Sequence, residues 1–380
     1  MSKIVDIYAL QSLPPSLINR DDTGSPKNAI FGGIPRQRVS SQSWKRAIRR
    51  YFEENFNADD IGDRSKRLPE KIARKLEERG IAQEEAIDRA TQLFKLSGIK
   101  VAVDKQAQKK AKEEDSQDDS VLYPRSSYLL FLSKQQINRA VDVLLKQDVK
   151  EMKKAEAKAI LDTEHSVDMA MFGRMVADDP AYNVDASVQV AHALGIHESA
   201  PEFDYFTAVD DLAEEGEETG AGMIGTIQMM SSTLYRYATV NLDGLAENLD
   251  STENAKQATA DFVEAFIASM PTGKINTFAN QTLPELVYVV VRDTRPVSLV
   301  NAFESPIEAD GAKGRREVGA EALAQEARDV ENVYGFKPRA SFVTGLGDLA
   351  TPFEDIAEKV TLADLKEQLA GAIDELMGDE

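Results

Sequence analysis

The sequence predicts an α+β fold, a sheet with helices over one of its faces. Several stretches alternate apolar and polar residues with a period of two, which is typical of strands. Other stretches repeat apolar residues every three to four positions, which is typical of helices that bury one side. No G-x-x-x-x-G-K-[ST] phosphate loop is present. Strands separated by helices without such a loop favour the α+β class.

The first strand is expected at KIVDIYAL, residues 3–10, and a loop rich in Pro, Gly, Asn and Asp at residues 12–28. Two adjacent glycines, Gly32 and Gly33, then predict a tight turn. A helix should begin at the serines of residues 40–43, which are natural N-caps. Its buried stripe should consist of Trp44, Ala47, Ile48, Tyr51 and Phe52.

A mostly helical segment follows. Residues 68–96 predict two helices separated at Gly80, and two more helices should lie between residue 128 and residue 161. Residues 101–120 are charged and almost free of bulky apolar groups, so we expect a loop or linker there.

Strand-like patterns then return at residues 165–175, 185–194 and 233–242, with a short helix as the alternative at residues 185–194. Between the last two lies a long segment, residues 195–230, whose centre is too acidic and too rich in glycine to belong to a core. A loop of that length inside a compact domain is usually functional or disordered.

The last third of the chain should contain three helices and one strand. The helices are expected near residues 252–269, 317–332 and 361–377. The β-branched run LVYVVVR at residues 286–292 predicts a buried strand and is too short to span a membrane.

Net charge and the absence of cysteine limit the possible functions. The chain has 45 Lys and Arg against 65 Asp and Glu, a formal net charge of −20. This argues against a protein that coats nucleic acid with its whole surface, but leaves room for one basic groove. The lack of cysteine excludes thiolate catalysis and is consistent with a reducing cytoplasm. Without a signal sequence, we expect a soluble, cytoplasmic protein with no membrane partner.

The stretch RQRVSSQSWKRAIRR, residues 36–50, contrasts with that charge, since it has six basic side chains and no acidic one. In the expected helix, Lys45, Arg46, Arg49 and Arg50 lie in the first two to three turns. The N-terminus of a helix carries partial positive charge and favours Asp or Glu there by about 0.3 to 1 kcal/mol. A phosphate bound by the first N–H groups and Lys45 would explain the arrangement. A solvated charged face is the alternative, and the residues alone leave both open.

Catalytic patterns are weak. Asp21 and Asp22 could hold a divalent metal for phosphodiester hydrolysis, although such a pair more often shapes a turn or pairs with a cation such as Arg20. The histidines His165, His192 and His197 match no zinc motif and complete no catalytic triad. We expect His192, on an apolar strand face, to be a core residue.

Three aromatic residues lie within four positions in FDYF, residues 203–206, at the start of the long segment. Aromatic side chains on a loop can stack on unpaired bases, or can anchor the loop to its own domain.

Together these residues resemble the CasC family, the CRISPR RNA-binding backbone subunit of type I-E CRISPR Cascade complexes. The resemblance rests on NRDD…K.AIFGG..R.R.SSQS.KRA.R across residues 19–49 and on VDMAMFGRM at residues 167–175. It also rests on VQVAHAL followed by FTAVDDL, on LYRYATVNL, and on VSLVNAFE at residues 297–304.

The resemblance implies a modified RRM/ferredoxin-like palm with a helical fingers insertion and a flexible thumb. The palm would comprise residues 1–56 and 161–194, the fingers residues 57–160 and the thumb residues 195–232. Residues 233–380 would complete the palm and add C-terminal helices.

The implied function is non-catalytic. Copies of such a subunit polymerise along CRISPR RNA and present the guide for pairing with target DNA. The implied partners are CRISPR RNA, target DNA through the guide, other copies of the chain, and the large, small, 5′-cap and crRNA-processing endonuclease subunits of Cascade. No cofactor or metal is expected.

The resemblance also assigns RNA contacts. The phosphate-contacting group would be Arg20, Lys27, Ser40, Gln42, Lys45, Arg46 and Arg49. Met175 would make an apolar contact at a kinked nucleotide, and Tyr205, Phe206 and Thr207 would form the wedge of the thumb. The alternative is a metal-dependent ribonuclease subunit that cuts target RNA through Asp21 or Asp22, as related backbone subunits of type III complexes do with a loop aspartate.

Overall fold

The computed structural model describes residues 2–57, 61–103, 123–176, 180–207 and 224–378. The chain forms two compact units. The first unit comprises residues 1–51, 188–243 and 256–380, and the second comprises residues 52–187 and 244–255. The division into palm, fingers and thumb stays a prediction.

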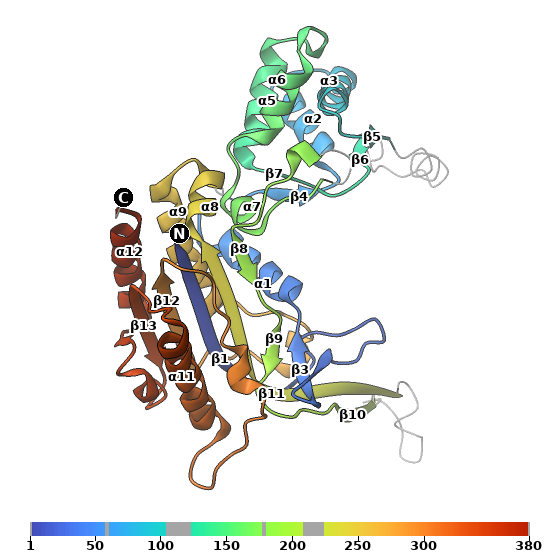
Figure 1. Cartoon of the computed structure of the whole chain (residues 1–380). Helices are drawn as coiled ribbons and strands as arrows, with labels where there is room; N and C mark the ends of the chain where they lie inside the picture. The colour runs from blue at the N-terminus through green and yellow to red at the C-terminus, as the bar shows by residue number, and fades with distance from the viewer. Residues whose placement is uncertain (1, 58–60, 104–122, 177–179, 208–223, 379–380) are drawn as a thin grey trace, which may run out of the picture. The chain divides into compact units, whose positions relative to one another are not determined.

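The first unit is built on a mixed sheet with the strand order β14-β13-β12-β1-β11-β9-β3-β2 (Figure 1). β8 and β10 also pair with β11, and among the described strand pairs of this sheet only β13–β14 is parallel. The strands are β1 (Ile4–Ser16), β2 (Asn28–Phe31), β3 (Ile34–Val39), β8 (Val188–Val190), β9 (Ala193–Gly195), β10 (Glu202–Thr207), β11 (Ile224–Asn241), β12 (Leu286–Arg292), β13 (Ala340–Gly345) and β14 (Glu358–Lys359).

Helices cover both faces of this sheet. The helices of this unit are α1 (Ser41–Asn55), α9 (Thr252–Ala268), α10 (Ile275–Phe278), α11 (Arg315–Tyr334) and α12 (Leu362–Gly378), with short 3-10 helices at Val300–Phe303 and Thr351–Phe353. On one face, Tyr8 packs in one cluster with Ala324 of α11. On the other, Arg236 of β11 lies between Trp44 of α1 and Phe266 of α9. The expectation of one covered face is therefore wrong. Every residue of β12 is buried, and a strand buried on both sides indicates a sheet that is covered on both faces.

The second unit is mostly helical. Its helices are α2 (Leu68–Glu78), α3 (Gln83–Leu96), α5 (Lys134–Lys146), α6 (Lys154–Asp162), α7 (Val167–Phe172) and α8 (Leu242–Leu249), with 3-10 helices at Val149–Glu151 and Pro180–Tyr182. Two small sheets pair β4 (Asp63–Ser65) with β7 (Leu130–Leu132) and β5 (Val101–Ala102) with β6 (Arg125–Ser126). The core joins residues such as Leu76, Phe94 and Leu144. No helix in the described part of the chain has the length and apolar character needed to cross a membrane.

Most predicted elements are confirmed, including the break between α2 and α3, where Gly80 has a φ of 91°. Most of the loop predicted at residues 101–120 lies outside the described residues. The strand predicted at residues 165–175 is wrong, because residues 167–172 form the short helix α7, which ends at Gly173 with a φ of 77°. A segment this short matches both periods, so alternation alone cannot decide between strand and helix.

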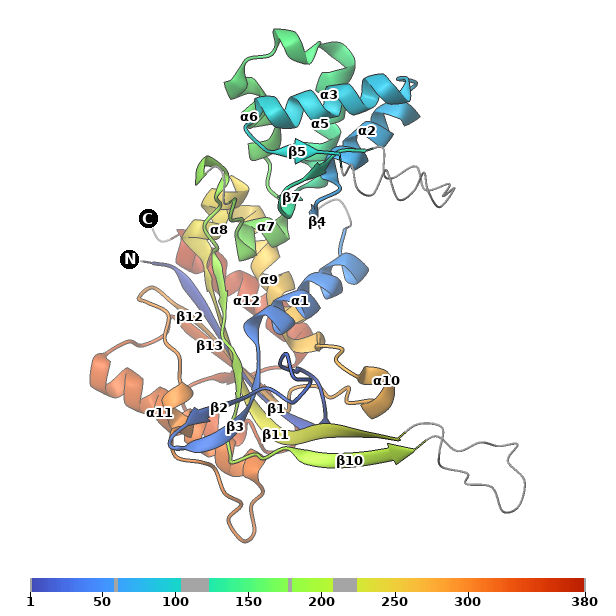
Figure 2. The same ribbon diagram turned by 90° about the vertical axis from the view of Figure 1, so that its right-hand side faces the viewer.

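Two strands extend into regions predicted as loop. β1 continues to Ser16, with a register shift after Leu13 that accommodates the exposed Pro14 and Pro15, because proline cannot donate to a ladder but is tolerated at a bulge. β10 and the start of β11 form an antiparallel ribbon within the predicted thumb, of which residues 208–223 lie outside the described residues (Figure 2).

Candidate nucleic-acid interface

Helix α1 begins where the sequence predicts, immediately after Ser40. The Ser40 carbonyl accepts hydrogen bonds from the N–H groups of Ser43 and Trp44 at 3.0 and 3.3 Å. The first turn of α1 contains no acidic residue, and its N-terminal partial charge is therefore not offset by a carboxylate of the same turn. This matches the geometry of an anion site at a helix N-terminus.

The predicted buried stripe fixes the orientation of α1. Trp44, Ala47, Ile48 and Phe52 are buried, and Tyr51 lies at the edge of the stripe, where its hydroxyl donates to Glu264 at 2.9 Å. The remaining side of the helix is therefore available to solvent.

Lys45, Arg46 and Arg49 form a basic strip of α1, which lies beside the buried stripe on the helix surface. Gln42 and Arg46 are exposed, whereas Lys45 and Arg49 are half-buried. At 100° per residue, Gln42, Lys45 and Arg49 fall within about 60° of one another around the helix. Burial lowers the pKa of Lys45, so an anion beside its ammonium group would restore the stability of the charged form.

The loop after β1 is tied to the start of α1. Lys27 N–H donates to the Asn19 carbonyl at 3.0 Å, and Ser40 N–H donates to the side-chain oxygen of Asn19 at 2.9 Å. Arg20, which is exposed, forms a backbone bridge with Pro26 in the same loop. The structure thus places Arg20, Lys27 and Ser40 next to the first turn of α1. Sequence reasoning missed the linking role of Asn19, although it lies within the NRDD motif.

A buried cation lies under this helix. The Arg236 guanidinium is 3.7 Å from the centroid of the Trp44 ring and 4.2 Å from that of Phe266. It donates to Gln11 Oε1 at 2.7 Å and to the Phe266 carbonyl. Burial lowers its pKa to about 9, and no carboxylate among the described residues contributes to that pKa. Arg236 therefore positions Trp44 and adds positive potential beneath the basic strip.

The two arginines of the basic stretch that precede α1 differ from each other. Arg36 is fully buried and donates to the carbonyls of Gly195, Phe303 and Glu304, so it has a structural role. Arg38 lies at the surface, with its Nη1 3.1 Å from Nδ1 of His192. Sequence reasoning did not select Arg38.

The prediction that His192 is a core residue is wrong, because His192 is exposed and His197 is the buried histidine. Thr233 N–H donates to Nε2 of His197 at 3.1 Å. Nδ1 of His197 donates to the Glu198 carbonyl at 2.7 Å. The reason is a bulge: Val190 pairs with Ala238 and Leu194 with Tyr235, which leaves one extra residue on the β8–β9 side.

The ribbon of β10 and β11 separates the three residues of the predicted wedge. Because side chains alternate along a strand, Tyr205 and Thr207 lie on one face with Phe203, and Phe206 lies on the other. Phe203 and Tyr205 are 70% and 63% exposed, so both rings are available for stacking. The Phe206 ring covers Gly225, where any side chain would overlap it.

Met175 belongs to the second unit and projects from a turn held by a buried arginine. Arg174 donates to the Tyr182 carbonyl at 2.7 Å and pairs with Asp162. Its backbone also exchanges hydrogen bonds with Val184. Met175 itself is 84% exposed, which an apolar contact residue requires.

Comparisons with known proteins identify the family. Residues 5–368 match the model of the CT1975-like protein family. The chain belongs to this family. A chain of a structure described as "CRISPR RNA-guided surveillance complex, pre-nicking" superposes with a TM-score of 0.81 and 34% identity, covering 97% of this chain and 100% of that one.

A second chain, from a "CRISPR RNA-guided surveillance complex", gives a TM-score of 0.72 and 30% identity over 97% of this chain and 99% of its own. No curated protein matches the sequence. The chain is thus a Cascade-type Cas protein.

The central strands of this CT1975-like protein do not offer their tyrosines as a platform for bases. RRM domains stack bases on exposed aromatic residues of the sheet. Here Tyr237 and Tyr288 both stack on Tyr8, with ring centroids 5.3 and 5.5 Å away, but at 9%, 1% and 0% exposure the three rings are closed to a ligand. An accessible cationic surface lies instead at the start of α1.

Asp21 has a structural role in its turn. One of its carboxylate oxygens accepts from Thr23 N–H at 2.9 Å, from the Thr23 hydroxyl at 2.7 Å and from Ser25 N–H at 3.0 Å. The hydrogen bond from the Thr23 hydroxyl lowers the pKa of Asp21 most. In the described ranges, no three acidic or histidine side chains are grouped to bind a metal.

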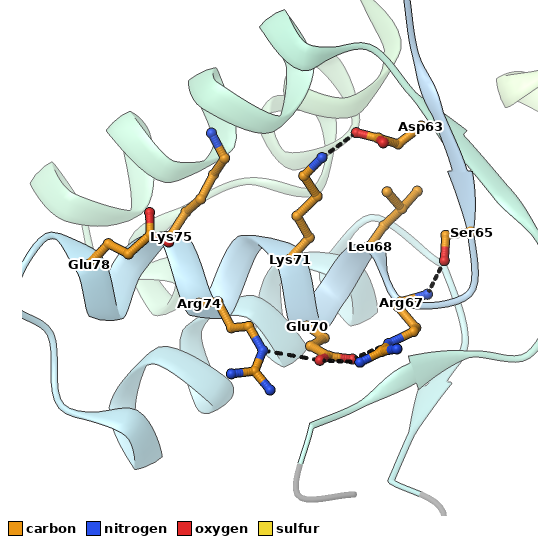
Figure 3. Close-up of a pocket in the computed structure, with 9 residues that line it drawn as sticks. All are labelled: Asp63, Ser65, Arg67, Leu68, Glu70, Lys71, Arg74, Lys75 and Glu78. Carbon is orange, nitrogen blue, oxygen red and sulfur yellow. Dashed lines mark hydrogen bonds and ion pairs between the residues drawn. The ribbon is translucent and has the colours of Figure 1, made fainter. Parts of the chain in front are cut away.

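A second basic region lies along α2, where a cavity of about 450 Å³ opens on the second unit (Figure 3). Three of its four cationic residues pair with nearby carboxylates, and Lys75 bonds to the neutral amide of Asn138. Arg67 and Arg74 both donate to the buried Glu70, at 2.7 and 3.0 Å, and Lys71 pairs with Asp63 at 2.5 Å. The cavity therefore offers less positive charge to an anion than its residue types indicate.

Proposed function

We propose that this Cascade-type protein is a CasC-like backbone subunit of a type I-E complex, which binds CRISPR RNA without cutting it. The observation that carries the proposal is the acid-free first turn of α1, flanked by Lys27, Lys45 and Arg49, in a chain of net charge −20. A negative exterior would confine a bound polyanion to that patch. Phosphate contacts carry no sequence information, which suits a subunit that leaves sequence recognition to the guide.

Assembly is the second part of the proposal. Copies of the chain would polymerise along one guide, together with the large, small, 5′-cap and crRNA-processing endonuclease subunits, and present it to target DNA in the cytoplasm. Two similar chains of full-length coverage come from CRISPR RNA-guided surveillance complexes, which supports this. The exposed rings of Phe203 and Tyr205 support base stacking by the thumb. An RRM-like palm belongs to the same proposal.

Purification of the full chain with its bound nucleic acid tests this function. We expect a co-purifying short RNA that nuclease footprinting shows to be protected at a regular interval. The double variant Lys45→Ala and Arg49→Ala should lose that RNA. A wild-type protein that carries no RNA and binds none added to it would contradict the proposal.

The ribonuclease alternative has its own test. A guide-loaded assembly is incubated with complementary RNA and Mg²⁺, and we expect no cleavage, because the Asp21 carboxylate is already held by Thr23 and Ser25. Regularly spaced cuts that vanish in Asp21→Ala or Asp22→Ala would overturn the non-catalytic role.

A further inference from the structure

Three groups that can carry positive charge meet beside the start of α1. Arg38 donates from Nε to the Asn28 carbonyl at 3.1 Å, and its Nη1 lies 3.1 Å from Nδ1 of His192. Burial lowers the pKa of His192 most, and Arg38 and Lys27 lower it further, so both cations lie close enough to act on the imidazole. No carboxylate contributes to that pKa among the described residues.

The contact with Arg38 determines which nitrogen of His192 can donate. A guanidinium has only N–H donors, so Nδ1 of His192 must accept and the ring proton must lie on Nε2. His192 is exposed, so Nε2–H is a neutral donor available to a ligand.

This cluster is continuous with the start of α1. Arg38 N–H donates to the Lys27 carbonyl at 2.9 Å, and Lys27 shares Asn19 with Ser40. Arg38 and Ser40 are two residues apart at the end of β3, which corresponds to about 6.6 Å along a strand. The backbone of a single RNA strand could therefore contact both Arg38 and the start of α1.

We propose that Arg38 and His192 form, with Lys27, a second anion-binding point, which holds a phosphate of the same RNA strand that the first turn of α1 binds. The inference rests on the proposed function. Arg38 contributes charge and a planar pair of donors, which suit phosphate oxygens. His192 contributes one neutral hydrogen bond, and its other nitrogen keeps Arg38 in place.

The two residues should therefore affect RNA binding differently. At neutral pH, His192→Ala should weaken binding about fivefold and leave the salt dependence unchanged, because a neutral donor displaces no counterion. Arg38→Gln should weaken binding about tenfold and reduce the slope of log affinity against log salt by about one. His192→Gln keeps an N–H donor near the position of Nε2 and should bind almost as the wild type does.

The measurement is fluorescence anisotropy of a labelled oligouridine with the full chain, over a series of salt concentrations. Arg295→Gln is the matched control, because Arg295 is an exposed arginine beyond the end of β12, which lies three strands from β9 and four from β3. It should leave affinity and slope unchanged. Millimolar inorganic phosphate should compete only weakly, because the site binds a strand and not a free ion.

Two outcomes separate this inference from the function on which it rests. If Lys45→Ala with Arg49→Ala loses binding while His192→Ala and Arg38→Gln bind as the wild type does, the second point is overturned and the proposed function stands. If all of these variants bind as the wild type does, both fail. Should Arg38→Gln not fold, as judged by thermal unfolding, the His192→Ala and His192→Gln pair decides alone.

Discussion

Helices α1 and α2 are both rich in basic residues, but they lie against buried charges of opposite sign. Under α1, the buried Arg236 stacks on Trp44 and has no carboxylate partner among the described residues. In α2, Glu70 belongs to the first turn, is 3% exposed and accepts from both Arg67 and Arg74 (Figure 3). The acid that the N-terminus of a helix favours is thus present in α2 and absent from α1.

This difference shows that a count of cations does not identify an anion site. At α2, Arg67 and Arg74 pair with Glu70 of the same helix, which stabilises the fold and offsets part of their charge. In α1 the first turn forgoes a stabilisation of about 0.3 to 1 kcal/mol, and its positive potential remains available to a ligand. The sign of the buried charge beside each helix distinguishes the two, whereas a count of their cations does not.

The largest effect is expected from removing the buried cation under α1. Arg236→Ala would leave Gln11 Oε1 and the Phe266 carbonyl without their donor, and would open a cavity between Trp44 and Phe266. We expect a loss of about 3 kcal/mol in the free energy of unfolding, measured by urea denaturation. Arg236→Met, which keeps most of the volume, should cost less. A variant as stable as the wild type would show that Arg236 does not hold α1.

The two basic helices can be compared directly by paired substitutions. Lys45→Ala with Arg49→Ala in α1 should weaken binding of oligouridine about 30-fold and reduce the salt slope by about two, because two phosphate contacts are lost. Lys71→Ala with Lys75→Ala in α2 removes the same formal charge. It should change both quantities far less, since Asp63 offsets the charge of Lys71 and a hydrogen bond to Asn138 holds Lys75. Equal losses in the two double variants would mean that binding follows net charge alone.

The Glu70 carboxylate of α2 should make the stability of the protein depend on pH. Hydrogen bonds, first of all from Arg67, lower the pKa of Glu70 from 4.5, so its contribution is present above that pH and is lost as the pH falls through the folded-state pKa. Glu70→Gln should destabilise the protein by about 1 kcal/mol at neutral pH and by almost nothing in strong acid. Thermal unfolding at several pH values measures this. A cost that does not change with pH would contradict the pairing.

The sequence predicted the features that depend on local periodicity. The start of α1 and its buried stripe were predictable because fifteen residues follow one helical pattern. The exposure of His192 was not predictable, because it depends on one extra residue between β8 and β9, which only the pairing with β11 reveals. Neither the Arg236–Trp44 stack nor the Arg38–His192 pair was predictable, because each joins residues more than 150 positions apart.

One substitution tests most directly whether the first turn of α1 is kept free of acid in order to hold a phosphate. Gln42→Glu is isosteric, and Gln42 is exposed, so packing should not change. A carboxylate there should raise the free energy of unfolding by about 0.5 kcal/mol through the helix N-terminus, yet weaken RNA binding about tenfold by repelling the phosphate.

Anisotropy titrations and urea denaturation of Gln42→Glu, with Gln42→Ala as the control, give both quantities. We predict that affinity and stability change in opposite directions in Gln42→Glu. An affinity for oligouridine equal to that of the wild type would contradict the account.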